Sequence, residues 1–220
     1  MKNVKAIIFD AYGTLFDVNS AAEKCKDKIG DKWEGFANYW RTTQLEYTWL
    51  RSLMDRHKDF WQVTEDSLDK SMKAFKIDNS MRSKLLDLYK ILSTFPEVKE
   101  VLNNLKEKNY KLAILSNGTP SLLNELVKSN NLESIFDDIF SIEEVGIYKP
   151  SSKVYDIPIK KFKIQKDEVV FLSANTWDVS GGGNYGYYSV WVNRNNNIFD
   201  SLDYIPQNQV KNLGELLDLI

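Results

Sequence analysis

Polar side chains that could perform chemistry follow several short apolar runs of this chain. The first run, Val4–Phe9, is rich in β-branched residues and leads directly into Asp10. Such a run is typical of a strand buried on both faces of a parallel sheet, and open α/β sheets place their chemistry at the carboxyl ends of strands. Gly13 allows a tight turn, and Thr14 then brings a hydroxyl back toward the carboxylate. An ordinary strand that ends in an Asp turn is the alternative interpretation.

A second apolar run, Lys111–Leu115, ends in the same way at Ser116 and Asn117. Thr119 then suits a helix N-cap, and Pro120 suits the first position of that helix. The free N–H groups of a helix N-terminus attract anions, so a hydroxyl and an amide placed there indicate an anion site. Many α/β turns share this pattern, which is weak when taken alone.

Polar groups also follow two later strands. The predicted strand Asp138–Ile142 is followed by Lys149, and the predicted strand Glu168–Leu172 is followed by Ser173, Asn175 and Asp178. A last strand over Tyr188–Val192 and a closing helix over Leu213–Ile220 complete the pattern. Strands that alternate with helices predict an α/β fold with a Rossmann-like, doubly wound parallel sheet.

A long segment between the first two strands contains no good strand. Residues 19 to 95 are expected to be helical, with helices near Thr64–Phe75 and Ser80–Leu92, and the next helix, Glu97–Lys108, returns to the sheet. We therefore predict a core domain of residues 1–16 and 96–220, with an inserted helical cap domain of residues 17–95.

One cap helix, Trp33–Met54, is apolar on two opposite faces when projected at 100° per residue. The face expected to pack on the cap's own core carries Trp33, Phe36, Trp40, Tyr47, Leu50 and Met54. The opposite face carries Arg41, Leu45, Trp49 and Ser52. This second face must pack against a site or another subunit, and Trp49 is a candidate for the subunit contact. Arg41 either faces a site or pairs with a core acid.

Composition excludes several classes of protein. The 220 residues have a formal net charge of −2, which argues against a broadly basic surface for nucleic acid. There is one cysteine and one histidine, so no disulfide is expected within the chain and no multi-histidine metal site. The histidine, His57, lies in a polar run expected at the solvated end of a helix. With no apolar stretch of membrane-spanning length, we expect a cytoplasmic protein with no membrane partner.

Together and in this order, the polar groups resemble the four motifs of the haloacid dehalogenase-like hydrolase superfamily, over essentially the whole chain. The stretches that carry the resemblance are Phe9–Asp17, Gln44–Arg51, Ser116–Gly118, Tyr148–Pro150 and Ser173–Asp178. The arginine-containing helix is similar to that of one branch, the (S)-2-haloacid dehalogenases, also called type II or L-2-haloacid enzymes.

This resemblance implies hydrolysis of S-2-haloalkanoic acids to R-2-hydroxyalkanoic acids, without metal or cofactor. Asp10 would displace the halide and form an ester with the enzyme, which water then hydrolyses. The catalytic residues it implies are Asp10, Thr14, Arg41, Lys149, Ser173, Asn175 and Asp178. The substrate-binding residues it implies are Ala11, Tyr12, Arg41, Leu45, Phe60, Ser116, Asn117, Tyr155 and Trp177.

The resemblance also gives these residues individual roles. Arg41 and Asn117 would hold the departing halide, whereas Ser116 and Lys149 would hold the substrate carboxylate. Asp178 would position or activate the hydrolytic water. Tyr155 would support Lys149 by hydrogen bonding, and the alkyl pocket would be lined by Tyr12, Leu45, Phe60 and Trp177.

Two features depart from the family pattern. Thr42 stands where the family often has glutamine, and the run Gly181–Gly183 is richer in glycine than expected. Because glycine costs backbone entropy in a helix, we expect this segment to be loose. Both departures bear on the range of substrates.

Two other functions compete with the dehalogenase. A Mg²⁺-dependent phosphatase or phosphonatase of the same superfamily would carry acids where this chain has Tyr12 and Ala174. A halide is a stable leaving anion that needs no proton, so their loss favours carbon–halogen cleavage. A non-catalytic protein that binds a small carboxylate at Ser116, Lys149 and Arg41 is the second alternative. The family and the two-faced Arg41 helix also suggest a homodimer.

Overall fold

Six short strands form one parallel sheet in the computed structural model, which describes residues 3–220. The strands are β1 (Ala6–Phe9), β2 (Lys111–Ser116), β3 (Asp138–Ser141), β4 (Val169–Ser173), β5 (Tyr188–Val192) and β6 (Asn208–Val210). Their order in space is β3-β2-β1-β4-β5-β6, and every neighbouring pair is parallel. Strands β2 and β3 follow on one side of β1, and β4, β5 and β6 are then added on its other side. This arrangement confirms the predicted Rossmann-like, doubly wound α/β fold.

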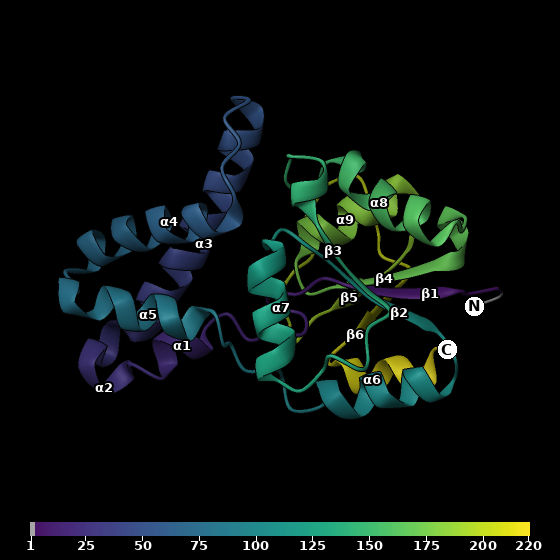
Figure 1. Ribbon diagram of the computed structural model, residues 1–220, viewed down its shortest axis with the longest axis horizontal. Helices are drawn as coiled ribbons and strands as arrows, with labels where there is room; N and C mark the ends of the chain where they lie inside the picture. The colour runs from purple at the N-terminus through teal and green to yellow at the C-terminus, as the bar shows by residue number, and fades with distance from the viewer. Residues whose placement is uncertain (1–2) are drawn as a thin grey trace.

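The sheet carries helices on both faces. They are α6 (Val98–Glu107), α7 (Pro120–Ser129), α8 (Ser152–Phe162), α9 (Thr176–Tyr185) and the 3₁₀ helices η3 (Ile142–Glu144), η4 (Lys166–Glu168) and η5 (Leu213–Asp218). Helices α8 and α9 lie on one side of the sheet, and α6 lies with η5 on the other (Figure 1). The closing helix expected over Leu213–Ile220 is present as the shorter 3₁₀ helix η5. Strand β6 was missed because its three residues carry no apolar run.

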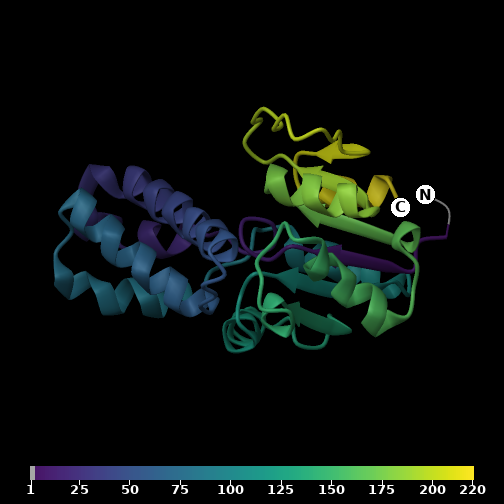
Figure 2. The same ribbon diagram turned by 90° about the horizontal axis from the view of Figure 1, so that it is seen from above.

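Five further α-helices form a separate block, which we call the cap helices. They are α1 (Ser20–Glu23), α2 (Lys26–Ile29), α3 (Trp33–Leu53), α4 (Phe60–Phe75) and α5 (Arg82–Tyr89), with the 3₁₀ helices η1 (Gly30–Lys32) and η2 (Asn79–Met81) between them. The block lies beyond the carboxyl ends of the strands (Figures 1 and 2). Helix α4 begins four residues earlier than expected, because the Asp59 side chain caps it by accepting from the Gln62 N–H at 2.9 Å. No helix within residues 3–220 has the length and apolarity needed to cross a bilayer.

The two chain segments that connect the cap helices to the sheet run side by side. The Asp17 N–H donates to the Ser93 carbonyl at 2.8 Å, and the Phe95 N–H donates to the Leu15 carbonyl at 3.1 Å. The exit from β1 and the return to α6 are thus bonded to each other, which fixes where the cap helices begin and end relative to Asp10.

Helix α3 buries a different face in its second half than the projection predicts. Phe36 and Trp40 are buried as expected, but Leu50 and Met54 are 43% and 59% exposed. The buried residues after Trp40 are Thr43, Gln44 and Thr48. Polar side chains are tolerated there because they are hydrogen-bonded; the Thr48 hydroxyl, for example, donates to the Leu45 carbonyl at 2.6 Å. The assignment of Leu50 and Met54 to the core was therefore wrong.

The glycine run on α9 is a close-packed surface. A Cβ atom on Gly181 would lie 2.7 Å from Pro150 Cβ, and one on Gly182 would lie 2.6 Å from the Phe171 ring. A Cβ atom on Gly183 would overlap the Tyr204 ring. The glycines let α9 approach β4 and the loop after η3, and they bring the amino end of α9 close to Lys149. We infer that the run serves packing, in place of the looseness expected from its composition.

We predict that Gly182→Ala lowers the stability of the folded chain by about 1–3 kcal/mol, because the new methyl group must displace the Phe171 ring. Helix propensity alone predicts the opposite sign, since alanine is the better helix former. Asn184→Ala, at an exposed position of the same helix, is the matched control and should be neutral or slightly stabilising. Chemical denaturation of the three proteins measures the effect, and a gain in stability for Gly182→Ala would contradict the packing argument.

Candidate active site

Asp10 stands at the carboxyl end of the central strand and is 5% exposed. All four residues of β1 are buried, and the Asp10 N–H continues the sheet by donating to the Leu172 carbonyl at 2.8 Å. Gly13 then takes φ of +89°, a conformation that favours glycine, and the chain turns back on itself. The turn brings the Thr14 hydroxyl to 3.1 Å from Asp10 Oδ2. The predicted strand, turn and returning hydroxyl are all present.

The two oxygens of the Asp10 carboxylate have different surroundings. Oδ2 accepts hydrogen bonds from three side chains. The donors are Thr14 Oγ1 at 3.1 Å, Asn175 Nδ2 at 2.9 Å and Ser173 Oγ at 3.4 Å. Oδ1 accepts only from Lys149 Nζ, at 3.2 Å, among the residues that the structure describes. The carboxylate is thus oriented by β4 and by its own turn, and Oδ1 is the oxygen with more free lone-pair capacity.

Lys149 is a fully buried cation between two carboxylates. Its Nζ lies 3.2 Å from Asp10 Oδ1 and 2.8 Å from Asp178 Oδ2, and its side chain is 0% exposed. Burial by itself would lower the pKa of Lys149, but attraction from Asp10 and Asp178 outweighs burial and raises this pKa overall. Lys149 therefore remains an ammonium ion at neutral pH.

Asp178 is the second carboxylate on the lysine. Its Oδ1 accepts from the Tyr155 hydroxyl at 2.7 Å. We expected Tyr155 to bond to Lys149, but it bonds to Asp178 and supports the lysine only through this acid. Burial raises the pKa of Asp178 to about 6, although the nearby Lys149 ammonium acts in the opposite direction. Asp178 is thus an acid that is mostly ionised at neutral pH and takes up a proton under mildly acidic conditions.

Ser116 and Asn117 lie where β2 ends, as predicted. Thr119 caps α7 by accepting from the Leu122 N–H at 3.3 Å, and Pro120 is the first helical residue. The Asn117 Oδ1 accepts from the Lys149 N–H at 3.1 Å, which leaves the Asn117 amide group as a donor. The Ser116 Oγ accepts from the Gly118 N–H at 3.1 Å. The Asn117 side chain therefore joins the end of β2 to the Lys149 loop, whereas the Ser116 hydroxyl bonds within the turn that follows β2.

Arg41 reaches the same region from the cap helices. Its Nη1 donates to Gln44 Oε1 at 2.9 Å, and its Nη2 lies 3.4 Å from the Tyr12 carbonyl oxygen. Within residues 3–220, no carboxylate lies within 4.0 Å of this guanidinium, in contrast to the core ion pair that we considered. An arginine with spare N–H donors beside a nucleophile is suited to holding an anion.

Gln44 is a site residue that the sequence analysis missed. It is 1% exposed, and its Nε2 donates to Thr64 Oγ1 at 2.7 Å while Tyr89 donates to its Oε1 at 3.2 Å. Thr64 on α4 and Tyr89 on α5 thus hold the Gln44 side chain, and Gln44 in turn orients Arg41. Its position one turn after Trp40 was the available signal, but glutamine on a helix is usually exposed.

The apolar candidates fall into two groups. The Tyr12 ring stacks on Tyr89 with centroids 5.7 Å apart and contacts Phe60 at 5.1 Å, so these aromatic rings join the nucleophile turn to the cap helices. Trp177 packs edge-to-face on Trp49 at 5.4 Å. Trp49 thus makes a contact within the chain, between α3 and the segment after β4. Ala11 is buried beside Asp10, and Leu45 is half-buried one turn after Arg41.

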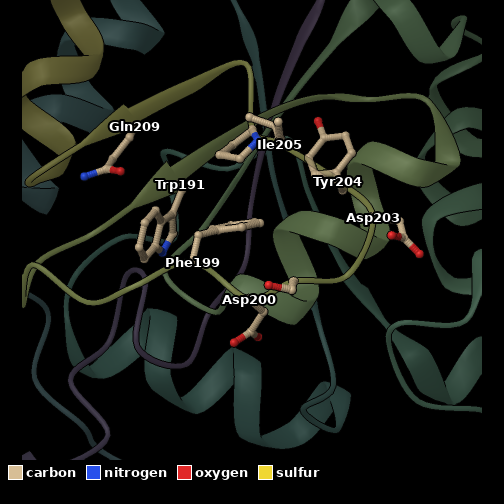
Figure 3. A pocket seen from close by; sticks show the side chains of 9 residues that line it. Trp191, Phe199, Asp200, Asp203, Tyr204, Ile205 and Gln209 are labelled. Carbon is tan, nitrogen blue, oxygen red and sulfur yellow. The ribbon is translucent and has the colours of Figure 1, made fainter.

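One apolar groove lies beside the predicted site residues, and a larger hollow lies away from them. An apolar groove of about 480 Å³ between the cap helices and the sheet is lined by Trp49, Ser52, Leu53, Ile147, Tyr148, Lys149, Pro150, Ser151, Trp177, Asp200 and Leu202. A hollow of about 820 Å³ lies instead beside β5 and the loop before β6, where Trp191, Phe199 and Tyr204 line it (Figure 3). None of the predicted site residues lines that hollow.

Known proteins match this chain along its whole length. The sequence model of the haloacid dehalogenase-like hydrolases matches residues 4–186. The chain belongs to the haloacid dehalogenase-like hydrolases. The (S)-2-haloacid dehalogenase of Pseudomonas sp. (strain YL) is 38% identical over 221 residues, covering 100% of this chain and 95% of that protein. The enzyme of the same name from Pseudomonas fluorescens is 37% identical over 218 residues, covering 98% and 96%.

A solved member of the family has the same fold over almost the entire chain. The L-2-haloacid dehalogenase from Xanthobacter autotrophicus, solved with chloropropionic acid covalently bound, superposes with a TM-score of 0.91 at 31% identity and covers 98% of each chain. Within the haloacid dehalogenase-like hydrolases, the chain therefore groups with the (S)-2-haloacid dehalogenases, as its motifs predict.

The raised pKa of Asp178 predicts how stability depends on pH. In the unfolded chain an aspartate has a pKa of about 3.9, so folding favours the protonated form of Asp178. This favourable contribution is complete below about pH 4 and is lost as the pH rises through about 6. We expect the melting temperature of Asp178→Asn, relative to that of the unmodified chain, to rise between pH 4 and about 6 and to level off above. Calorimetry across this range measures the difference, and a difference independent of pH would contradict the assignment.

Proposed function

We propose that this chain hydrolyses S-2-haloalkanoic acids to R-2-hydroxyalkanoic acids through an ester on Asp10, as an (S)-2-haloacid dehalogenase. The observation that carries the proposal is the Asp10 carboxylate, which is fixed through Oδ2 and paired with Lys149 through Oδ1, while Arg41 bonds to the Tyr12 carbonyl two residues further on. The relatives are named as dehalogenases, which agrees with this chemistry and favours it over the phosphatase alternative.

The first step forms the ester. Asp10 Oδ1 attacks C2 of the substrate in line, the carbon–halogen bond breaks, and the halide leaves with the bonding electron pair, so the configuration at C2 inverts. The Arg41 guanidinium and the free amide group of Asn117 hold the departing anion. Ser116 and Lys149 hold the substrate carboxylate, which positions C2 against Oδ1.

The second step releases the product. Water adds to Cγ of Asp10, and the ester carbonyl oxygen, which is the former Oδ2, develops negative charge. The three donors on Oδ2 stabilise that charge without moving. Asp178 takes the proton of the water, and its pKa of about 6 keeps it ionised for this role at neutral pH. The bond between Cγ and Oδ1 then breaks, and the leaving alkoxide takes up the proton held by Asp178 to give the hydroxy acid. The remaining proton of the attacking water passes to solvent, which restores the Asp10 carboxylate.

The positions of the missing phosphatase acids support carbon–halogen chemistry. Tyr12 stands two residues after Asp10, where a phosphatase needs an acid for a leaving alkoxide, and its hydroxyl has no hydrogen-bond partner among the described residues. Ala174 stands four residues before Asp178, where a phosphatase needs a carboxylate for Mg²⁺. A monoanionic haloacid requires neither group.

We further propose that residues 17–95 act as a cap domain and that the protein is a cytoplasmic homodimer. Leu50, Leu53 and Met54 support the dimer, because they leave an apolar surface exposed at the end of α3.

We predict halide release from S-2-chloropropionate and not from the R enantiomer, with R-lactate as the organic product. Because no step requires a metal, the rate should be unchanged when a chelator is present throughout. Ion chromatography of chloride and chiral chromatography of lactate measure both products. Activity on phosphate esters that depends on Mg²⁺, without halide release, would instead support the phosphatase alternative.

We predict that Asp178→Asn traps the ester. Loss of the base slows the water step more than the displacement step, so the halogen-free carbon skeleton of the substrate accumulates on the peptide that contains Asp10. Asp10→Asn is the control and should carry no adduct. Peptide mass spectrometry after incubation with S-2-chloropropionate tests this, and continued turnover by Asp10→Asn would rule out the proposed nucleophile.

A further inference from the structure

His57, the single histidine, joins the cap helices to the sheet. The sequence places it at the solvated end of a helix, but its side chain is only 28% exposed, and its Nε2 lies 2.9 Å from Glu143 Oε2. His57 belongs to the segment between α3 and α4, whereas Glu143 belongs to η3 after β3. The expectation of a solvated histidine was wrong because its partner lies 86 residues away in the chain.

The cap holds Tyr148 at three further points. The His57 ring lies 5.2 Å from the Tyr148 ring, the Tyr148 hydroxyl donates to the Lys58 carbonyl at 2.6 Å, and the Tyr148 N–H donates to Ser52 Oγ at 3.3 Å. Tyr148 is 2% exposed. Its ring and backbone are therefore held by the cap although it belongs to the sheet half of the molecule.

Tyr148 directly precedes Lys149, the cation on Asp10. The Lys149 N–H is bonded to Asn117 and its Nζ to Asp10 and Asp178, so little displacement of the backbone is possible without loss of these contacts. Because the two residues are consecutive, the cap contacts on Tyr148 and the carboxylate contacts on Lys149 constrain the same short loop. The position of the cap is thus coupled to the geometry of the nucleophile.

The contact between His57 and Glu143 has no competing partner in the described part of the chain. It is an ion pair when the imidazole is protonated and a hydrogen bond otherwise. His57 Nδ1 and Glu143 Oε1 are buried and have no other partner among residues 3–220. Charged groups nearby include Arg51, which pairs with Asp66, Glu144, which pairs with Lys161, and the exposed Arg56, Lys58 and Asp59. The Tyr148 hydroxyl stays neutral because burial raises the pKa of Tyr148.

We propose that His57 and Glu143 form a latch between the cap and the sheet that positions Lys149 through Tyr148, so that both are positioning residues for halide displacement. The proposal rests on the proposed dehalogenase function for its kinetic consequence. The latch constrains the Lys149 loop through the cap contacts on Tyr148, the residue before Lys149.

Kinetics of S-2-chloropropionate hydrolysis test the latch with three variants. We expect His57→Leu and Glu143→Gln to lower kcat by about tenfold, because small misplacements of reacting groups are costly. His57→Gln can still donate to Glu143 and should recover much of this loss. Glu144→Gln is the matched control, since the neighbouring Glu144 pairs with Lys161 inside the sheet half at 3.2 Å. Unchanged kcat in folded His57→Leu and Glu143→Gln would overturn the proposal.

Hydrogen exchange gives a readout that needs no turnover. At one fixed pH, the backbone amides of residues 146–152 should exchange faster in His57→Leu and in Glu143→Gln than in Glu144→Gln or the unmodified chain. If the two latch variants exchange faster but the unmodified chain releases no halide, the latch stands and the proposed function is wrong. Equal exchange in all four folded proteins would remove the latch and leave the proposed function in place.

Discussion

A buried ammonium ion between two carboxylates is the constraint on which this structure depends. Removing Lys149 from water carries a large electrostatic cost, which its ion pairs with Asp10 and Asp178 offset. The end of β1, the first turn of α9 and the loop after η3 must therefore meet at one point. Tyr155 and the glycines of α9 complete this arrangement, because Tyr155 satisfies the second oxygen of Asp178 and the glycines allow α9 to come close enough.

The site is shared between the two halves of the molecule. The sheet half presents Asp10, Lys149 and Asp178, whereas the cap helices present Arg41 on a hydrogen-bonded support of Gln44, Thr64 and Tyr89. Arg41 is thus fixed by side chains from three cap helices. In the proposed reaction, the geometry for an anionic leaving group consequently depends on how the cap packs internally as well as on where it lies.

The sheet and part of the Asp10 cluster could be predicted from the local sequence because Asp10, Ser116 and Ser173 directly follow apolar runs, whereas Lys149 and Asp178 were assigned through the family resemblance. Local pattern is sufficient for the first three, since the ends of parallel strands meet at one edge of a sheet. Gln44 and His57 could not be assigned in this way, because their partners lie on elements far away in the sequence and both look like surface residues. The projection of α3 failed after Trp40 because it assumes a single apolar neighbour along all 21 residues, whereas the second half of the helix packs through hydrogen-bonded threonine and glutamine.

The unequal surroundings of the two Asp10 oxygens have a consequence for the fate of individual atoms. In the proposed reaction Oδ1 leaves with the product, and the oxygen of the attacking water takes its place, while Oδ2 stays bound to its three donors. The hydroxyl oxygen of each product molecule therefore comes from the protein, and the solvent replaces it only afterwards. The enzyme renews one atom of its own side chain in every cycle, and the hydroxy acid made in the first cycle carries an oxygen that was incorporated when the chain was synthesised.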